Sequence, residues 1–245
     1  MQIIPLSEGS FTIDHSKLFV PFDTGKDNLQ ERPVGSLLVE IQPFVVVTSE
    51  DVLLLDAGLG FEKQGEMQLT GNLRSAGIEP SAITKVLMSH LHKDHAGGIS
   101  HKNTASGKYE LLFPQATYYV QRKEFAFAFE KGFPSYIPEE LECLRDAPNV
   151  QWLDGDGVID GYIKYELTGG HCPYHQVFRI VDGGTTAFFG GDNAPQLQQM
   201  KSKFVAKYDY DGKLAMELRQ QWWAEGQAGG WKFLFYHDIK IPVFG

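Results

Sequence analysis

The stretch Ser89-His90-Leu91-His92-Lys93-Asp94-His95-Ala96-Gly97-Gly98 decides the fold. Three histidines and one aspartate, all potential metal ligands, fall within six residues of a chain that has 8 histidines. They directly follow Lys85–Met88, a short apolar run that we predict to be a strand. Imidazole and carboxylate groups suit Zn²⁺ and related divalent ions, and the end of a strand leaves such side chains free to converge. The stretch therefore predicts a metal site rather than a solvated polar loop.

Three more potential ligands occur further along the chain, each just after a predicted strand. They are His171, Asp192 and His237, which follow the strands predicted at Tyr162–Leu167, Thr185–Phe189 and Lys232–Tyr236. Taken singly, Asp192 could cap a helix and His237 could be an ordinary surface histidine. Their shared position at strand ends favours a common site.

The remaining segments alternate between strand and helix patterns. We predict further strands at Gln2–Leu6, Ser36–Gln42, Phe44–Thr48, Val52–Leu55, Thr117–Val120, Gln176–Val181 and Ile241–Phe244. We predict helices at Met67–Ala76, Arg122–Glu130, Glu139–Arg145 and Asp211–Glu225. Ser16–Gly35 is expected to be a long loop at the lip of a substrate site, and His101–Tyr109 a polar loop. Because no repeat or linker divides the chain, one domain over 1–245 is expected.

Five separated elements of the chain resemble the metallo-β-lactamase superfamily. The run 89–98 resembles its metal-binding signature, and Leu54–Gly58 resembles its upstream Asp-x-Gly element. Gly170–Gln176 resembles its later Gly-His-x-x-Gly-His segment, while Asp192 and His237 match the last two ligand positions. The resemblance covers nearly the whole chain in the family's order. It implies an α+β fold, a four-layer αββα sandwich in which two mixed β-sheets are flanked by helices, with metals at one edge between the sheets.

The resemblance also implies how seven ligands divide between two metal ions. The first ion would take His90, His92 and His171, the second Asp94, His95 and His237, and Asp192 would bridge them. Seven ligands are more than one tetrahedral ion uses, whereas two ions ~3.5–4 Å apart can share a carboxylate and a hydroxide. We expect two divalent ions, zinc before Mn²⁺, Fe²⁺ or Co²⁺, which fit the same donors.

Such a site predicts a dinuclear metal-dependent hydrolase. A hydroxide that bridges the metals would attack an ester, lactone or related acyl bond of a small substrate. Asp94 would carry the proton to the leaving group, so Asp94 and Asp192 are the expected catalytic carboxylates. A non-catalytic metal-binding or regulatory domain on the same fold is the alternative of a different class, and it would predict an eroded ligand set.

Several residues near the ligands are assigned supporting or structural roles. Asp56, at the end of an apolar strand, is expected to accept a hydrogen bond from a ligand imidazole, although an Asx turn explains it equally well. His175 is expected beneath the His171 loop rather than on a metal. Cys172 is expected to be a small packing residue, and His15 and His101 are assigned to surface loops.

Composition excludes several classes of partner. The formal net charge of −9 repels polyanions, so we expect neither nucleic acid nor an anionic membrane as a partner. No apolar run approaches the ~18–20 residues of a membrane-spanning helix, and the amino terminus shows no secretory pattern. With 2 cysteines and no disulfide framework, the chain is expected to be cytoplasmic.

The resemblance narrows the substrate without naming it. The overall plan of the chain is similar to that of N-acyl-homoserine-lactonase-like and related hydrolases. Hydrolysis of a thioester, as in glyoxalase II-like enzymes, or of an organophosphate is the alternative. Those lactonases carry a tyrosine shortly after the bridging aspartate, whereas this chain has Asn193-Ala194-Pro195. Aromatic residues of Phe125–Tyr136 and Trp222–Trp231 either fill the core or line an acyl pocket. The alternating aromatics of Phe125–Phe129 also allow a homodimer contact.

Overall fold

Two six-stranded sheets form the centre of the molecule in a computed structural model, which describes residues 1–63 and 65–245. The first sheet has the order β1 (Gln2–Pro5), β5 (Phe44–Val47), β6 (Val52–Leu55), β9 (Lys85–Leu87), β12 (Thr117–Gln121) and β13 (Val150–Leu153). The second has the order β14 (Gly157–Ile159), β15 (Ile163–Leu167), β16 (Gln176–Asp182), β17 (Thr185–Phe189), β18 (Lys232–Leu234) and β19 (Val243–Phe244).

Both sheets are mixed, because hairpins make antiparallel pairs and helical crossovers make parallel ones. In the first sheet, β5 and β6 form a hairpin, and β6, β9, β12 and β13 then run parallel. In the second, β14 to β17 form an antiparallel meander, and α6 (Gly212–Gly229) leads to the parallel strand β18.

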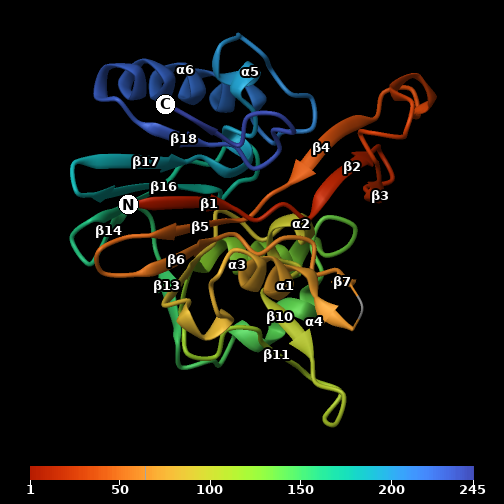
Figure 1. The fold of residues 1–245 in the computed structure, drawn as a ribbon, viewed down its shortest axis with the longest axis vertical. Helices are drawn as coiled ribbons and strands as arrows, with labels where there is room; N and C mark the ends of the chain where they lie inside the picture. The colour runs from red at the N-terminus through yellow and green to blue at the C-terminus, as the bar shows by residue number, and fades with distance from the viewer. Residues whose placement is uncertain (64) are drawn as a thin grey trace.

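Helices cover the outer faces of both sheets (Figure 1). α1 (Gln68–Ser75), α3 (Arg122–Lys131) and α4 (Pro138–Leu141) lie on the first sheet, and α5 (Leu197–Met200) and α6 lie on the second. Asp211 caps α6 by accepting a hydrogen bond from the Leu214 amide at 2.9 Å. These layers confirm the predicted four-layer αββα sandwich and its α+β class.

Alternating side chains on the strands separate three apolar layers. On β6, Leu53 and Leu55 point between the sheets, where they meet Phe178 and Phe189, whereas Leu54 points outward beneath α1. The outer face of the second sheet packs against Trp222 of α6 in the same way. The sheets are therefore held face to face, and the loops at one edge can build a site between them.

A small three-stranded sheet projects from this body, where Figure 1 shows β2 (Gly9–Ile13), β3 (Val20–Pro21) and β4 (Leu37–Ile41). The prediction of a structureless loop at Ser16–Gly35 is wrong in part, since β3 and a 3-10 turn, Leu29–Glu31, lie within it. β3 has little apolar alternation of its own and is held by pairing with β2. Part of this projection forms a wall of the site described below.

Other local predictions also differ from the structure. The ends of the expected polar loop His101–Tyr109 belong to two paired strands, β10 (Ser100–Lys102) and β11 (Tyr109–Leu111). His101 therefore lies on a strand. The helix expected at Glu139–Arg145 is the single turn α4 followed by a 3-10 turn, Glu142–Leu144. The remaining short elements are β7 (Glu62–Lys63), β8 (Glu66–Met67), α2 (Lys93–Ala96) and 3-10 turns at Pro80–Ala82 and Gly191–Asn193.

Within the described residues, none of the helices combines the length and the apolar character needed to cross a membrane.

Candidate metal centre

The ligand-rich stretch leaves the first sheet at the end of β9. The chain passes through Ser89 and His90, and His92 then occupies the N-cap position of the short helix α2, which carries Asp94 and His95. A Cβ atom at Gly98 would collide with the carbonyl oxygen of Ala57, so this position needs glycine for the close approach of the two loops. The motif is thus pressed against the loop that follows β6.

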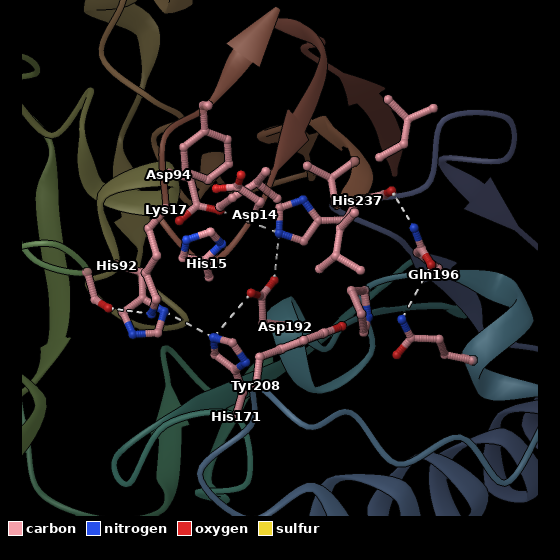
Figure 2. A pocket seen from close by; sticks show the side chains of 18 of the residues that line it. Asp14, His15, Lys17, His92, Asp94, His171, Asp192, Gln196, Tyr208 and His237 are labelled. Carbon is pink, nitrogen blue, oxygen red and sulfur yellow. Dashed lines mark hydrogen bonds and ion pairs between the residues drawn. The ribbon is translucent and has the colours of Figure 1, made fainter. Parts of the chain in front are cut away.

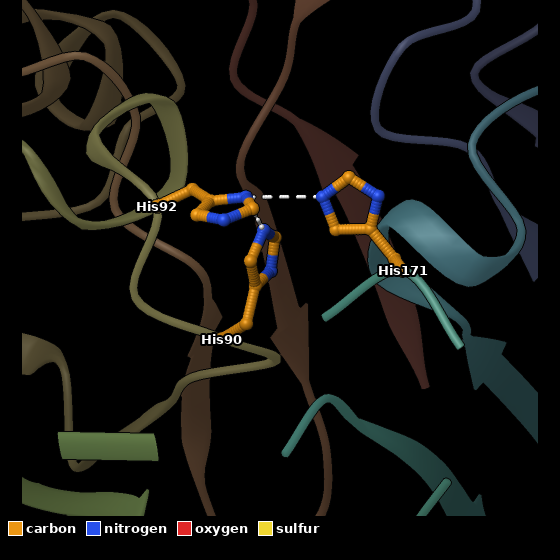
Figure 3. Close-up of side chains that lie close together, drawn as sticks. All are labelled: His90, His92 and His171. Atoms are coloured by element: carbon orange, nitrogen blue, oxygen red, sulfur yellow. Dashed lines mark hydrogen bonds between the residues drawn. The ribbon is translucent and has the colours of Figure 1, made fainter. Parts of the chain in front are cut away.

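The first cluster consists of His90, His92 and His171 (Figure 3). Nδ1 of His92 lies 3.0 Å from Nε2 of His90 and 3.0 Å from Nε2 of His171. His171 comes from the loop that joins β15 and β16, so the cluster joins the edges of both sheets. In a neutral imidazole, Nδ1 of His92 cannot form good hydrogen bonds with both neighbouring nitrogens at once. A cation placed among the three nitrogens could instead be bound by all of them.

The second cluster consists of Asp94, His95 and His237, whose ligand atoms all lie within 4.8 Å of one another. His237 follows β18 and its Nδ1 donates a hydrogen bond to the carbonyl oxygen of Glu40 at 2.7 Å. Its Nε2 therefore faces the cluster. The two clusters contain the same six residues that the family resemblance divides in this way.

Asp192 lies between the two clusters (Figure 2). Its Oδ1 is 3.1 Å from Nε2 of His95 and 3.0 Å from Nε2 of His237, and its Oδ2 is 3.2 Å from Nε2 of His171. Each carboxylate oxygen thus faces a different cluster. Gly191 allows this placement, because it adopts φ +47° and a Cβ there would crowd Ser89 and His175.

Unpartnered buried atoms show that these residues fit divalent ions. Among the described residues, Nε2 of His95 and Oδ1 of Asp192 are buried and have no hydrogen bond of acceptable geometry. Buried polar atoms are nearly always paired, so two unpaired ones that face each other mark a place for a further group. Imidazole nitrogens and carboxylate oxygens are donors that zinc and similar ions accept.

Burial and neighbouring charges set the protonation of the ligands. Burial, with His95 and the other imidazoles nearby, holds the pKa of His90 well below its usual range. Burial opposes charge on Asp192 as well, but the adjacent His237, His95 and His171 outweigh it and hold the pKa of this carboxyl well below its usual range. The pKa of His95 shifts the other way: burial lowers it, but Asp192 and Asp94 outweigh burial and raise it well above its usual range, so this imidazole would lose a proton on binding a metal.

Asp56 orients His95 from behind. Its Oδ2 accepts a hydrogen bond from Nδ1 of His95 at 2.7 Å, and the carboxylate also accepts from the amide and hydroxyl of Ser89, both at 2.6 Å. Asp56 is fully buried and adopts φ +55°, a conformation that is uncommon outside glycine. These contacts leave Nε2 of His95 free to face the second cluster.

Asp209 holds the ring of His171 as Asp56 holds that of His95. This role of Asp209 was not predicted from the sequence. Its Oδ1 accepts a hydrogen bond from Nδ1 of His171 at 2.8 Å, and its side chain is 1% exposed. Asp209 lies in the loop between α5 and α6, outside every motif of the family resemblance. The sequence offers no local signal for it, since a single aspartate in a polar loop is ordinary.

His175 lies next to the clusters and contacts the segment that carries Asp192. Its Nε2 accepts from the Asp192 amide at 3.2 Å, and its Nδ1 lies 3.1 Å from Nδ2 of Asn193. Cys172 is buried and its Sγ lies 3.5 Å from Oε2 of Glu124, whose Oε1 accepts a hydrogen bond from the Leu91 amide. Both residues therefore support the loops that present the ligands.

A cavity of about 570 Å³ opens over the candidate metal ligands. Figure 2 shows His15 and Lys17 reaching into it beside His92, so His15 lies in an exposed turn, as predicted, and this turn also lines the cavity. The turn after β2 brings His15 to the cavity. Because this turn is distant in sequence from the candidate ligands, no local sequence pattern predicts the contact. The cavity wall also includes apolar and amide side chains: Ile13, Phe19, Leu37, Val39, Phe204, Gln196 and Gln199.

Most of the aromatic residues left open between core and pocket pack in or against the core, whereas Phe133 is exposed. Phe125 contacts Phe129 and Trp152, and Trp222 packs on Phe188. The described cavity lining includes none of the aromatic side chains named at Phe125–Tyr136 or Trp222–Trp231.

Residues 40–222 match the profile of the metallo-beta-lactamase superfamily, which is more than half of the chain. The chain belongs to the metallo-beta-lactamase superfamily. Among curated members, it is 31% identical to the N-acyl homoserine lactonase AttM of Azorhizobium caulinodans over 121 residues. That alignment covers 44% of this chain and 40% of the lactonase, so it spans about two fifths of the relative's length.

Solved structures of the superfamily extend the likeness to almost all of the chain. A probable metal-dependent hydrolase from Staphylococcus aureus superposes with a TM-score of 0.80 at 22% identity and covers 99% of this chain and 91% of that one. AidC, a dizinc quorum-quenching lactonase in complex with a product, gives a TM-score of 0.73 at 20% identity, with 98% and 88% covered. At this identity the two likenesses establish the metallo-beta-lactamase fold.

Proposed function

We propose that this chain is a metal-dependent hydrolase that opens a lactone or ester bond of a small substrate at two divalent metal ions. The observation that carries the proposal is the position of Asp192, which presents one oxygen to each histidine cluster at 3.0–3.2 Å. All seven ligand positions hold ligand residues that converge, which supports an enzyme over a non-catalytic domain on the same fold.

His90, His92 and His171 would hold one ion, Asp94, His95 and His237 the other, and Asp192 both. When bound, such ions lower the pKa of water and polarise an acyl carbonyl. Zinc fits the nitrogen-rich first cluster best, and manganese, iron or cobalt fit the same donors.

Asp94 is placed to move a proton. Its Oδ2 lies 3.7 Å from Nε2 of His95 and 3.6 Å from Nε2 of His237, and the residue lines the cavity. A carboxylate that contacts an ion through one oxygen retains a second oxygen that can pass a proton to the leaving group of a substrate in the cavity. No serine or cysteine nucleophile is needed for this chemistry.

The cavity supports a small acyl substrate. Its wall is largely apolar, with Phe19, Leu37 and Phe204 among the lining side chains, and it can receive a short acyl chain. The lactonase names of the relatives support a lactone or ester over a thioester or phosphotriester.

A substrate panel with metal-loaded and chelator-treated protein tests the proposal. We expect turnover of a lactone or carboxylic ester that disappears on metal removal and returns with zinc. The panel includes a thioester, a phosphotriester and a β-lactam. Turnover that persists without metal, or none after reloading, would contradict the proposal.

A further inference from the structure

Two lysines, Lys17 and Lys93, line the cavity that also contains His92 and His171 of the first cluster. Lys17, in the turn between β2 and β3, donates from Nζ to Oγ of Ser135 at 2.6 Å, and Figure 2 shows its side chain extending beside His92. Lys93 donates from its backbone amide to the carbonyl oxygen of Ser135 at 2.9 Å. Ser135 thus joins the two lysines at one wall.

Both side chains are held in place rather than left free in solvent. Nζ of Lys93 lies 5.8 Å from the ring centre of Phe19 and 5.5 Å from that of Phe133, so it sits between two aromatic faces. Lys17 adopts φ +56°, a backbone conformation that costs energy for a residue with a side chain. The hydrogen bond to Ser135, 118 positions away in sequence, holds this strained residue so that its side chain stays at the cavity.

The charge of this wall is not neutralised by the protein. Among the described residues, neither ammonium group has a carboxylate oxygen within the 4.0 Å of an ion pair. The carboxylates that line the cavity are Asp14, Asp94 and Asp192. Oδ1 of Asp14 accepts hydrogen bonds from the amide and hydroxyl of Ser16, and the other two face the histidine clusters.

Two like charges at one wall of a cavity attract an anion. The formal net charge of the chain is −9, and the two ammonium groups are opposite in sign to it. Ser135 Oγ takes only one of the three hydrogens of the Lys17 ammonium group, and the others remain available to a ligand in the cavity.

We propose that the substrate carries a carboxylate group besides the bond that is cleaved, and that Lys17 and Lys93 bind this carboxylate. The inference rests on the proposed hydrolase function and specifies its substrate class: small esters or lactones with an anionic substituent. Water adds across the acyl C–O bond, which gives an acid and an alcohol, and the second carboxylate is unchanged. The two lysines are specificity-determining residues.

Two esters with the same leaving group test the proposal directly. 4-Nitrophenyl butyrate is neutral, whereas mono-4-nitrophenyl glutarate carries a free carboxylate on an acyl chain of similar length. We expect the metal-loaded protein to favour the glutarate ester in kcat/KM, with a preference that weakens as NaCl is added. Lys17→Met and Lys93→Met should each reduce the ratio of the two kcat/KM values about tenfold, mainly through KM of the glutarate ester.

A matched variant and a second readout keep the test decisive. Lys26→Met removes a lysine of the same projecting segment that pairs with Asp23 outside the cavity, and it should leave the ratio unchanged. Calorimetric titration of glutarate against butyrate measures binding without turnover, and glutarate should bind more tightly in a manner that depends on Lys17.

The outcomes separate the two proposals. If neither ester is hydrolysed but glutarate binding depends on Lys17, the hydrolase proposal fails and the carboxylate site stands. If the neutral ester is preferred, or Lys17→Met slows both esters equally, the carboxylate site is wrong while the hydrolase stands. Glutarate binding that equals butyrate binding would also overturn it.

Discussion

His171 is held between two aspartates: its Nδ1 donates to Oδ1 of Asp209 at 2.8 Å, and its Nε2 faces Oδ2 of Asp192 at 3.2 Å. His95 stands in the same relation to Asp56 behind it and Asp192 in front. One imidazole of each cluster is thus backed by a buried carboxylate, which fixes the ring and leaves Nε2 to face the centre.

Asp209→Asn should weaken metal binding at the first cluster. The amide keeps an acceptor oxygen but loses the charge that makes His171 more basic, and loss of such a partner costs about 10–100-fold in metal affinity. Competition with a chromophoric chelator measures the affinity. Asp154→Asn, at an exposed aspartate paired with Arg122, serves as the control. Unchanged affinity in Asp209→Asn would show that Asp209 does not support the metal.

Asp192→Ala should remove at least one metal equivalent per chain and most of the hydrolytic activity. The variant loses the only carboxylate that faces both clusters among the described residues. Elemental analysis of the purified variant counts the metal, and Asp192→Asn separates loss of charge from loss of shape. Two metals with full turnover would rule out the bridging role.

His175→Ala should reduce stability more than metal content. The substitution removes the acceptor of the Asp192 amide and opens a cavity, a loss of about 2–3 kcal/mol in the free energy of unfolding. Urea denaturation and metal analysis of the same sample give both quantities. Stoichiometric loss of metal with little change in stability would place His175 among the ligands.

Glu8 should make the protein less stable as the pH rises. Burial raises its pKa from 4.5 to about 7, against the hydrogen bond from the Leu59 amide, so the folded state takes up a proton that the unfolded state releases. The stabilising contribution is complete below pH 4.5 and is lost as the pH rises through about 7.

This change amounts to about 3 kcal/mol in the free energy of unfolding. Glu8→Gln cannot ionise, so relative to the wild type it should be more stable at pH 8 than at pH 5 by about that amount. Urea denaturation of both proteins at the two pH values measures the difference. An equal offset at both pH values would refute the role of Glu8.

The layers and the seven candidate ligand positions could be predicted because both leave local patterns in the sequence, which the family resemblance groups into one site. Apolar alternation on β6 and β5 places residues in two layers, and His90 to His95 are neighbours in the chain at a strand end. Each isolated ligand, such as His237, likewise follows an apolar strand that could be recognised by itself.

The residues around the ligands could not be predicted in this way. Asp209 reaches His171 only when the loop between α5 and α6 folds back on the second sheet, and Lys17 reaches the cavity because pairing of β2 and β3 turns the chain toward Ser135. These contacts join segments that are distant in sequence through polar residues of ordinary type. No residue spacing or hydrophobic periodicity in the sequence therefore predicts them.

The central claim is that one chain holds two metal ions, and the metal content of the wild-type protein tests it most directly. Inductively coupled plasma mass spectrometry of untagged protein, after saturation with zinc and removal of free metal, gives the ratio of metal to chain. The account predicts two ions per chain, with Asp192 between them. A ratio of one or of zero would contradict it.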